Sequence, residues 1–271
     1  MVAERSVEPF YADEHVTIYH ADSTHLAFLP DASVHLTVTS PPYNLAVAYA
    51  SANDALPYDR YLAWVAEWAR ALWRVSVEGG RACINVPLDS NKGGKRAVYA
   101  DYVHVFRAAG WTYQTTIVWN EQNISRRTAW GSWCSPSAPF VTAPVEMVAV
   151  FHKGPWRRPG RGRPSDLTRD EFLEWTLGVW TFPGESPRRA GHPAPFPEEL
   201  PRRLIKLYSY VGDVVLDPFV GSGTTCRVAR RLGRRAIGVD IDREYCARAA
   251  ASCRLAAADP LPPDWAETLQ C

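Results

Sequence analysis

Strands and helices alternate in the last third of the chain, and this alternation constrains the fold more than any other feature of the sequence. Residues 214–216 form a short apolar run, a glycine-containing turn follows, and a helical pattern covers about 224–232. Gly233 ends that helix, residues 236–241 form a second strand, and an alanine-rich helix runs to about 258. Such a βαβα unit indicates parallel strands with helices packed on the faces of the sheet.

The earlier two thirds of the chain continue the alternation. Apolar and β-branched runs predict strands, and apolar residues at helical spacing predict helices. The helix that starts with Asp59 as its N-cap is expected to stop at Gly79 and Gly80. The predicted strands cover 16–20, 34–39, 81–86, 113–119 and 145–151, and the other helices cover about 99–109, 169–177 and 200–210. We therefore expect an α/β fold with a mostly parallel, doubly wound sheet, in a single domain spanning residues 1–271.

Composition narrows the class of protein. With 271 residues and 46% hydrophobic residues, the chain can bury one substantial core. The net charge is only +1, so affinity for a polyanion would have to come from local clusters of Arg and Lys. The six cysteines form no CxxC pair and have no metal-ligand spacing, which favours reduced thiols, no metal and a cytoplasmic protein. No apolar run has membrane-spanning length.

A candidate nucleoside pocket lies between the strand and the helix of the last third. The turn from Asp217 to Thr225 exposes backbone N–H groups and the positive end of a helix dipole, and its glycines allow a ligand to approach the main chain. Asp240 ends the next strand, where an acidic side chain can reach ribose hydroxyls. The turn lacks the third glycine of a hydride-carrying cofactor site and the Lys of a P-loop. A tight strand-to-helix connection without a ligand is the alternative.

A second unusual segment ends the strand 34–39. The sequence Ser40-Pro41-Pro42-Tyr43-Asn44 follows at once, and two prolines cannot continue a β-ladder. Taken alone, this could be a strand-ending turn or an exposed polyproline ligand. Residues 45–57 have no clear period, so we expect a mobile loop over a site at this point.

Together, residues 39–44 and 217–225 resemble the amino-methylating DNA methyltransferases, and their order, with the catalytic motif first, is similar to the permuted β group. The likeness runs from Asp22 to about Arg254. It implies a Rossmann-like methyltransferase fold with permuted motif order, S-adenosyl-L-methionine as cofactor and double-stranded DNA as substrate. Dimers are frequent in this family, so a homodimer and a cognate restriction endonuclease in a restriction-modification system are the further partners to consider.

The resemblance also implies roles for individual residues. Asp217 and the glycine turn would hold the methionine moiety, Asp240 the ribose and Asp22 the adenine amino group. Ala21 stands where the family more often has glycine, and Asp22 could instead form an ordinary Asx-turn. The segment from His192 to Phe196 would close the pocket. The predicted cofactor-binding set is Asp22, His192, Phe196, Asp217, Pro218, Phe219, Gly221, Ser222, Gly223, Thr224, Thr225 and Asp240.

The predicted catalytic residues are Ser40, Pro41, Pro42 and Tyr43. An exocyclic base amine is a poor nucleophile because its lone pair is delocalised into the ring, and hydrogen-bond acceptors on both N–H groups favour a pyramidal, reactive nitrogen. Ser40 Oγ and the Pro41 carbonyl would be those acceptors, and Tyr43 would stack on a flipped base. Serine is no strong base at neutral pH, so we expect direct in-line transfer, with the proton leaving afterwards to solvent.

Serine in place of the family's common Asp favours cytosine N4 as the methylated atom, with adenine N6 as the alternative. Cytosine C5 chemistry needs a thiolate nucleophile, and the chain has no Pro-Cys step. Methylation of protein glutamine or RNA, and a DNA-binding module without activity, are the remaining rivals. The DNA sequence that would be recognised is not indicated.

Basic residues cluster in the segment 153–163. We expect a small basic insertion over residues 153–190 that serves as the target-recognition region and contacts phosphates. A solvated basic loop is the alternative. The predicted DNA-binding residues are Asn44, Lys153, Arg157, Arg158, Arg161 and Arg163.

Overall fold

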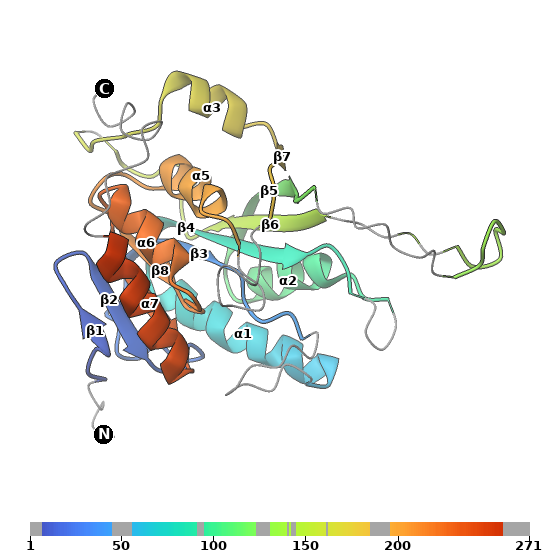
Figure 1. Ribbon diagram of the computed structural model, residues 1–271, viewed down its shortest axis with the longest axis horizontal. Coiled ribbons are helices and arrows are strands. Elements are labelled where there is room, and N and C mark those ends of the chain that lie inside the picture. Colours follow the sequence, from blue (N-terminus) through green and yellow to red (C-terminus); the bar gives the residue numbers. More distant parts are fainter. Residues whose placement is uncertain are drawn as a thin grey trace.

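One mixed sheet organises the molecule. The computed structural model describes residues 7–44, 56–90, 95–122, 131–139, 141, 145–160, 162–184 and 196–256. Within them, the strands are β1 (Tyr11–Ala12), β2 (Val16–His20), β3 (Val34–Thr39), β4 (Ser76–Pro87), β5 (Thr112–Asn120), β6 (Val145–His152), β7 (Val179–Thr181), β8 (Val214–Asp217) and β9 (Arg235–Asp240). They form a single nine-stranded sheet in the order β1-β2-β9-β8-β3-β4-β6-β5-β7 (Figure 1).

The sheet is mostly parallel, as predicted. Strands β2, β9, β8, β3 and β4 pair in parallel. Strand β6 is antiparallel to both β4 and β5, so β5 and β7 run in the same direction as the main set, and β1 is antiparallel to β2. The carboxyl ends of β2, β9, β8, β3, β4 and β5 therefore lie along one edge of the sheet, which we call the carboxyl edge. The opposite edge is the amino edge.

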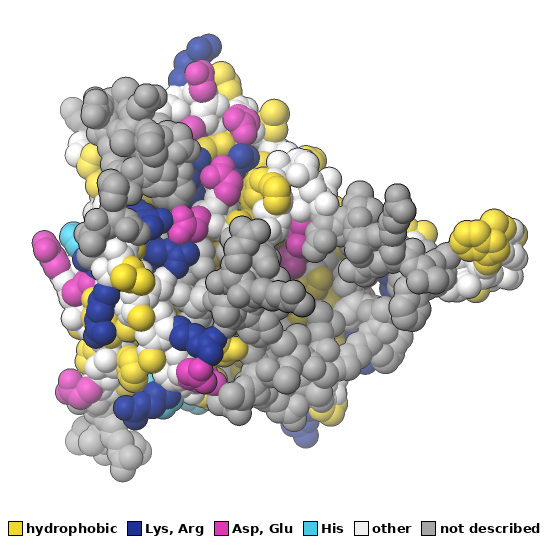
Figure 2. All heavy atoms as spheres, in the orientation of Figure 1, with side chains coloured by type: hydrophobic (Ala, Val, Ile, Leu, Met, Phe, Trp, Pro, Cys, Tyr) yellow, Lys and Arg dark blue, Asp and Glu magenta, His cyan; other side chains and the backbone are white. Residues whose placement is uncertain are grey.

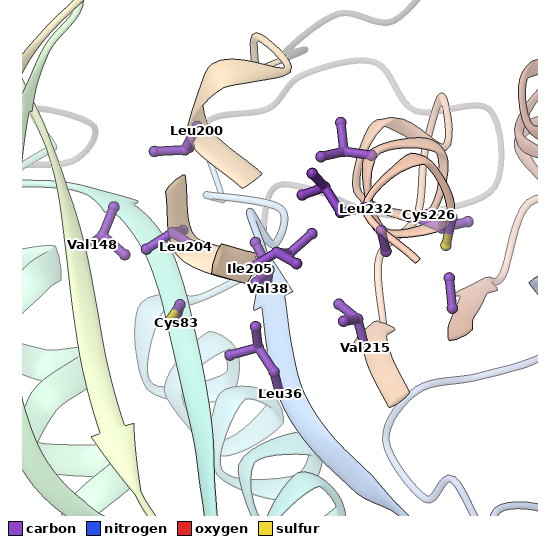
Figure 3. Close-up of a cluster of buried hydrophobic side chains, with 14 of the residues drawn as sticks. Leu36, Val38, Cys83, Val148, Leu200, Leu204, Ile205, Val215, Cys226 and Leu232 are labelled. Atoms are coloured by element: carbon purple, nitrogen blue, oxygen red, sulfur yellow. The ribbon is translucent and has the colours of Figure 1, made fainter. Parts of the chain in front are cut away.

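Helices cover both faces of this sheet (Figure 1). They are α1 (Tyr58–Val75), α2 (Val98–Ala108), α3 (Arg169–Trp175), α5 (Glu199–Tyr208), α6 (Thr224–Arg231) and α7 (Arg243–Ala256). One apolar core lies between the sheet and α5, α6 and α7, and a second lies between the sheet and α1 and α2. Figure 3 shows the first core, where side chains of β3 such as Leu36 and Val38 meet Leu204 and Ile205 of α5. The arrangement is doubly wound because alternate residues of the strands feed the two cores.

The boundary between α1 and β4 differs from the prediction. The helix ends at Val75 and the strand starts at Ser76, so β4 runs through Gly79 and Gly80. Gly79 tolerates this because it takes a positive φ of 73°, and its N–H donates to the carbonyl of Lys153. Pro57 occupies the N-cap position of α1, and Asp59 lies in the first turn without capping the helix.

The expected basic insertion is largely part of the main fold. In its described residues, β7 pairs with β5 and α3 packs near α5. Trp175 and Trp180 are buried in the first core. A different segment lies away from the body: Figure 1 places residues 131–139, between β5 and β6, far from the sheet, and Figure 2 shows hydrophobic atoms there. No helix in the described ranges has the length and apolar character needed to span a membrane.

Candidate active site

Two segments far apart in the sequence meet at the carboxyl edge. Strands β3 and β8 are parallel neighbours, with Thr37 opposite Leu216. At their ends, Thr39 Oγ1 donates a hydrogen bond of 2.7 Å to Asp217 Oδ1, and both residues are buried. Ser40 and the turn after Asp217 therefore begin side by side, as the predicted pairing of the two motifs requires.

The glycine turn has the conformation that its sequence predicts. Gly221 and Gly223 take positive φ values of 48° and 85°. A Cβ on Gly223 would lie 2.8 Å from the Cα of Ala249, so only glycine fits against α7. The Gly221 N–H donates to Asp240 Oδ2 at 3.0 Å, which ties the turn to the end of β9. Helix α6 starts directly after Gly223 and has no side-chain cap.

Two acidic side chains flank this turn. Burial raises the pKa of Asp217 to about 6, although hydrogen bonds from Thr39 and the Phe219 N–H lower it. Burial also raises the pKa of Asp240, against hydrogen bonds from the N–H groups of Asp242 and Gly221. Buried carboxyl groups of this kind lose part of their hydration and gain most from a ligand that supplies a positive charge or N–H and O–H donors.

The remaining predicted cofactor residues lie around the same edge, with one exception. Ser23 donates to the carbonyl of Pro218, and Ser222 Oγ lies 3.2 Å from Thr224 Oγ1. The Phe219 ring packs against Trp64 and Trp68 of α1. Phe196 is partly buried against the first core. His192 lies outside the described residues.

Asp22 forms the Asx-turn that was the alternative to a ligand contact. Its Oδ1 accepts hydrogen bonds of 2.8 Å from both the backbone N–H and the hydroxyl of Thr24. The Ala21 N–H donates to the carbonyl of Asp240, so Asp22 nonetheless lies beside the end of β9. The Asx-turn leaves Oδ2 as the atom through which Asp22 would contact a nucleoside.

These groups fit S-adenosyl-L-methionine by their chemistry. Asp217 suits the α-ammonium of an amino acid, an uncapped helix start suits a carboxylate, and Asp240 suits vicinal hydroxyls. Within the described residues, no group of three or more His, Cys, Asp or Glu side chains is arranged to hold a metal ion.

The predicted catalytic segment forms a hydrogen-bonded network. Ser40 Oγ lies 2.5 Å from Tyr43 Oη, and the Tyr43 hydroxyl lies 3.3 Å from Glu146 Oε2 and 3.1 Å from the carbonyl of Asn85. Tyr61 donates to the carbonyl of Pro42 at 2.8 Å, which fixes the proline turn against α1. Pro41 is buried at the start of this turn.

Sequence reasoning missed Asn85 and Glu146. Asn85 Nδ2 donates to both Tyr43 Oη and Glu146 Oε2, and Asn85 is only 2% exposed. Its Oδ1 is a buried acceptor without a hydrogen-bond partner in the described structure. Desolvation and the negative charge of Glu121 raise the pKa of Glu146 to about 7. The available signal was one polar residue inside each of two apolar strands, Cys83 to Val86 and Val145 to Phe151.

The predicted DNA contacts of the basic segment require correction. Lys153 is buried, and its Nζ donates to the carbonyls of Trp73 and Ser76 at 2.9 Å each. Arg158 and Arg163 form ion pairs with Asp213, which is fully buried. The physical reason is the direction of β6: because it is antiparallel, its end, and with it this segment, lies at the amino edge.

The three other residues predicted to contact DNA are Asn44, Arg157 and Arg161. The Asn44 side chain bonds to the N–H and the carbonyl of Leu56, so it joins the two ends of the connection that follows β3 and is not available to a base. Arg157 is exposed, but it follows Trp156, whose carbonyl bonds to Arg81 near the amino edge. Arg161 lies outside the described residues.

Comparison with known proteins gives consistent matches. A family model described as DNA methylase, for N6 and N4 methyltransferases, matches residues 34–251. The type II methyltransferase M.MjaVI of Methanocaldococcus jannaschii is 53% identical over 158 residues, covering 58% of this chain and 81% of that protein. M.MjaI, a type II methyltransferase of the same organism, is 30% identical over 267 residues, covering 83% of this chain and 87% of that protein.

A solved structure is also similar. TTHA0409 of Thermus thermophilus, provisionally described as a DNA modification methylase, was solved in complex with S-adenosyl-L-methionine. It superposes with a TM-score of 0.71 at 30% identity and covers 89% of this chain and 94% of its own. A similar overall fold is thus found in a protein that was solved with this cofactor.

Proposed function

This chain belongs to the DNA methylase family of N6- and N4-directed amino-methyltransferases, and on that basis we propose that it methylates the exocyclic N4 of cytosine in double-stranded DNA. It is a DNA methyltransferase that uses S-adenosyl-L-methionine. The proposal adds the atom that is methylated, the residues that act on it, and direct in-line transfer to a base flipped out of the duplex.

The observation that carries the proposal is the hydrogen bond between Thr39 and Asp217. It fixes the strand that ends in Ser40 against the strand that ends in the glycine turn. A methyl donor held by that turn and an amine held at Ser40 would then face each other across two adjacent strand ends, which is the proximity that in-line transfer requires.

Each side of the site has its own task. Asp217, Asp240 and the Gly221 to Thr225 turn would hold S-adenosyl-L-methionine, which supplies an electrophilic methyl group on its sulfonium. Ser40 Oγ and the Pro41 carbonyl would accept hydrogen bonds from the amine, and the Tyr43 ring would stack on the base. The tie from Tyr61 to Pro42 holds the proline turn in place, so the acceptors are preorganised.

The choice of cytosine N4 rests on Ser40. The family more often has Asp at this position, and this chain has a serine, whose hydroxyl is neutral. We take serine here as favouring cytosine N4. Adenine N6 is the alternative, since its amine needs the same acceptors. Methylation of protein glutamine or RNA has less support, because the similar proteins M.MjaVI and M.MjaI are type II methyltransferases. A restriction-modification setting and a homodimer are parts of the same proposal.

Nucleoside analysis tests the function directly. The protein is incubated with unmethylated duplex DNA and methyl-labelled cofactor, and the digested DNA is separated into its nucleosides. We expect label in N4-methylcytosine, and a loss of at least a hundredfold in rate for Ser40→Ala, because a preorganised acceptor is removed. Label in N6-methyladenine would overturn the base assignment, and no label in any base would overturn the enzyme proposal.

A further inference from the structure

Ser40 cannot act as the base that the proposed reaction needs. An exocyclic amine that gains a methyl group must lose a proton, and a serine hydroxyl cannot keep that proton at neutral pH. A carboxylate at position 40 could take it directly. The site does contain a carboxyl group close by, but on a different strand: Glu146, the second residue of β6.

The hydrogen bonds between Ser40 and Glu146 form a continuous chain. Ser40 Oγ is 2.5 Å from Tyr43 Oη, and Tyr43 Oη is 3.3 Å from Glu146 Oε2. Asn85 Nδ2 donates to both of the last two atoms, and the Tyr43 hydroxyl is placed to donate to Glu146 or to the Asn85 carbonyl, 3.1 Å away. Either atom can donate in the bond between Ser40 and Tyr43, and the chain leads toward Glu146 when Ser40 donates to Tyr43 and Tyr43 donates to Glu146. The lone pairs of Ser40 Oγ then remain available to an incoming N–H group.

The charges around Glu146 suit an acceptor of protons near neutral pH. The titratable groups that act on it in the described residues are Glu121, which follows β5, and Tyr43. Glu121 and desolvation raise its pKa, while the hydrogen bonds from Asn85 and Tyr43 lower it. Tyr61 on α1 faces Tyr43, and Tyr102 on α2 lies behind it. Desolvation raises the pKa of Tyr43 well above its usual value, so Tyr43 passes a proton on and does not remain ionised.

We propose that Glu146 is the final acceptor of the proton that the methylated amine loses, and that Ser40 and Tyr43 conduct the proton to it. The proposal rests on the proposed function and replaces loss of the proton directly to solvent. It applies to cytosine N4 and to adenine N6 alike, since both are exocyclic amines.

The step balances as a relay of three transfers. The amine nitrogen forms a bond to the methyl carbon as the carbon–sulfur bond breaks, and the nitrogen then carries one proton in excess. That proton passes to Ser40 Oγ as the hydroxyl proton of Ser40 passes to Tyr43 Oη. The proton of Tyr43 passes to Glu146, which becomes a neutral carboxylic acid. Glu146 returns its proton to water before the next turnover.

Single-turnover rates measured against pH test the relay. For the wild-type protein with saturating DNA and cofactor, we expect the rate to fall as the pH drops below about 7, because Glu146 must be ionised to accept a proton. Glu146→Gln should lower the rate by about a hundredfold and remove the pH dependence, with little change in KM for DNA or cofactor. Tyr43→Phe should cause a similar loss, and the double variant should lose no more than either single variant.

Glu121→Gln provides a second variant with a different expected result. Removing the negative charge beside Glu146 should move the midpoint to lower pH and leave the plateau rate at high pH as it is. The protonation of Glu146 can also be measured without any reaction, from the infrared absorption of buried carboxyl groups in the cofactor-free protein. One group should titrate near pH 7, should be missing in Glu146→Gln, and should titrate lower in Glu121→Gln.

The outcomes separate the relay from the function beneath it. A Glu146→Gln protein that keeps the wild-type rate and midpoint would overturn the relay while the methyltransferase stands. The relay is equally overturned if Glu121→Gln leaves the midpoint in place, even where Glu146→Gln does not fold. A wild-type protein that transfers no methyl group to any DNA base would overturn the proposed function, and the relay with it.

Discussion

Asp217 is a buried carboxyl group whose hydrogen-bond donors are neutral. Thr39 and the Phe219 N–H bond to it, and its pKa is nevertheless raised to about 6. A ligand with an ammonium group would favour the ionised form and bring the pKa down again. If Asp217 holds the ammonium group of the cofactor, as proposed, cofactor affinity is coupled to the protonation of this one residue.

Cofactor binding should thus depend on pH around Asp217. The carboxylate attracts the ammonium of S-adenosyl-L-methionine and the neutral acid does not, so affinity should weaken as the pH falls through about 6 and level off above it. Thr39→Val removes a hydrogen bond that lowers this pKa, so the midpoint should shift upward. Titration calorimetry from pH 5 to 8 measures both. Identical affinity at all pH values in the wild type would contradict the assignment of Asp217 to the ammonium.

The residues of the site were predictable to different degrees. Ser40, Asp217 and Gly223 stand in local patterns, namely a strand end followed by prolines or glycines, which are visible without knowing what lies opposite. Glu146 belongs to the site only because β6 runs antiparallel, which brings the start of this strand to the carboxyl edge. Strand direction depends on long-range pairing and has no local signature, so neither Glu146 nor its partner Asn85 could be assigned in advance.

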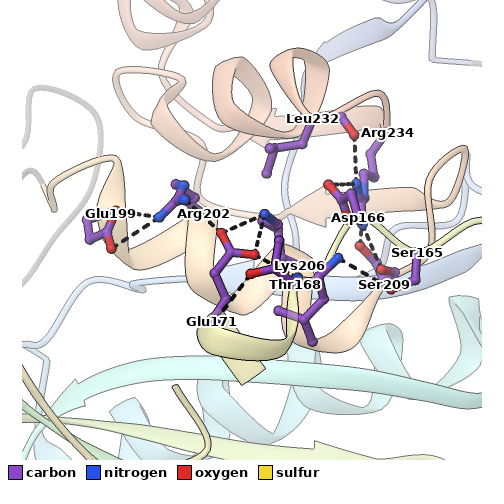
Figure 4. Close-up of polar contacts among 11 residues, drawn as sticks. Ser165, Asp166, Thr168, Glu171, Glu199, Arg202, Lys206, Ser209, Leu232 and Arg234 are labelled. Carbon is purple, nitrogen blue, oxygen red and sulfur yellow. Dashed lines mark hydrogen bonds and ion pairs between the residues drawn. The ribbon is translucent and has the colours of Figure 1, made fainter. Parts of the chain in front are cut away.

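Among the elements, α3 owes its position to ion pairs as well as to apolar contacts. Thr168 and Glu171 form a capping box at its start, and Glu171 also bonds to Lys206 and Arg202 of α5 (Figure 4). The Lys206 side chain is fully buried, and burial lowers its pKa. Glu171 therefore links helix initiation to the packing of α3 against the body.

Replacing Glu171 should destabilise the protein strongly. Glu171→Ala leaves Lys206 buried without its carboxylate and removes half of the capping box, which should lower the free energy of unfolding by about 3–5 kcal/mol. Glu174→Ala is a matched control in the same helix, because Glu174 is 65% exposed and its partner Arg203 keeps a second carboxylate, Glu199. Its effect should stay within about 1 kcal/mol. Urea unfolding compares the two, and equal effects would contradict this role for Glu171.

Helices and strands were predicted correctly where the apolar residues recur with a clear helical or strand period. The prediction failed where pairing with a neighbouring strand determines the structure. Nearly all strands and helices lie within a few residues of their expected positions. The prediction that α1 ends at Gly79 and Gly80 was wrong. The backbone of Lys153 forms hydrogen bonds with both glycines, so they belong to β4. Strand β7 was not expected, since three residues that pair with a neighbour have no period of their own.

At the scale of the whole molecule, the proposed function requires DNA to approach the carboxyl edge, where Ser40 lies. The connection between β5 and β6 leaves from this edge, because Asn120 pairs with Val145 at the ends of the two strands. Residues 131–139, which belong to its described part, carry Trp133, which is 78% exposed. A large aromatic side chain at such a place can stack on bases or insert between them.

Trp133→Ala should therefore weaken binding of duplex DNA by about tenfold, the equivalent of ~1.4 kcal/mol and within the usual range for aromatic stacking. Trp156→Ala is the matched control, since Trp156 is 60% exposed but lies near the amino edge. It should leave DNA affinity unchanged, and cofactor affinity should be the same in both variants. Fluorescence anisotropy with labelled duplex DNA measures the difference; a larger loss for Trp156→Ala would place the DNA at the other edge.

The pairing of β2 with β9 determines when the sheet can be completed during synthesis. Val16 pairs with Ala236 and His20 with Asp240, so a strand made at the beginning of translation obtains this parallel partner only near the end. Strands β3, β4, β5 and β6 can assemble while the nascent chain is still being extended, whereas the half that contains Asp240 must wait until the last strand has left the ribosome. An interrupted message would yield a product that has the Ser40 strand and lacks the Asp240 strand.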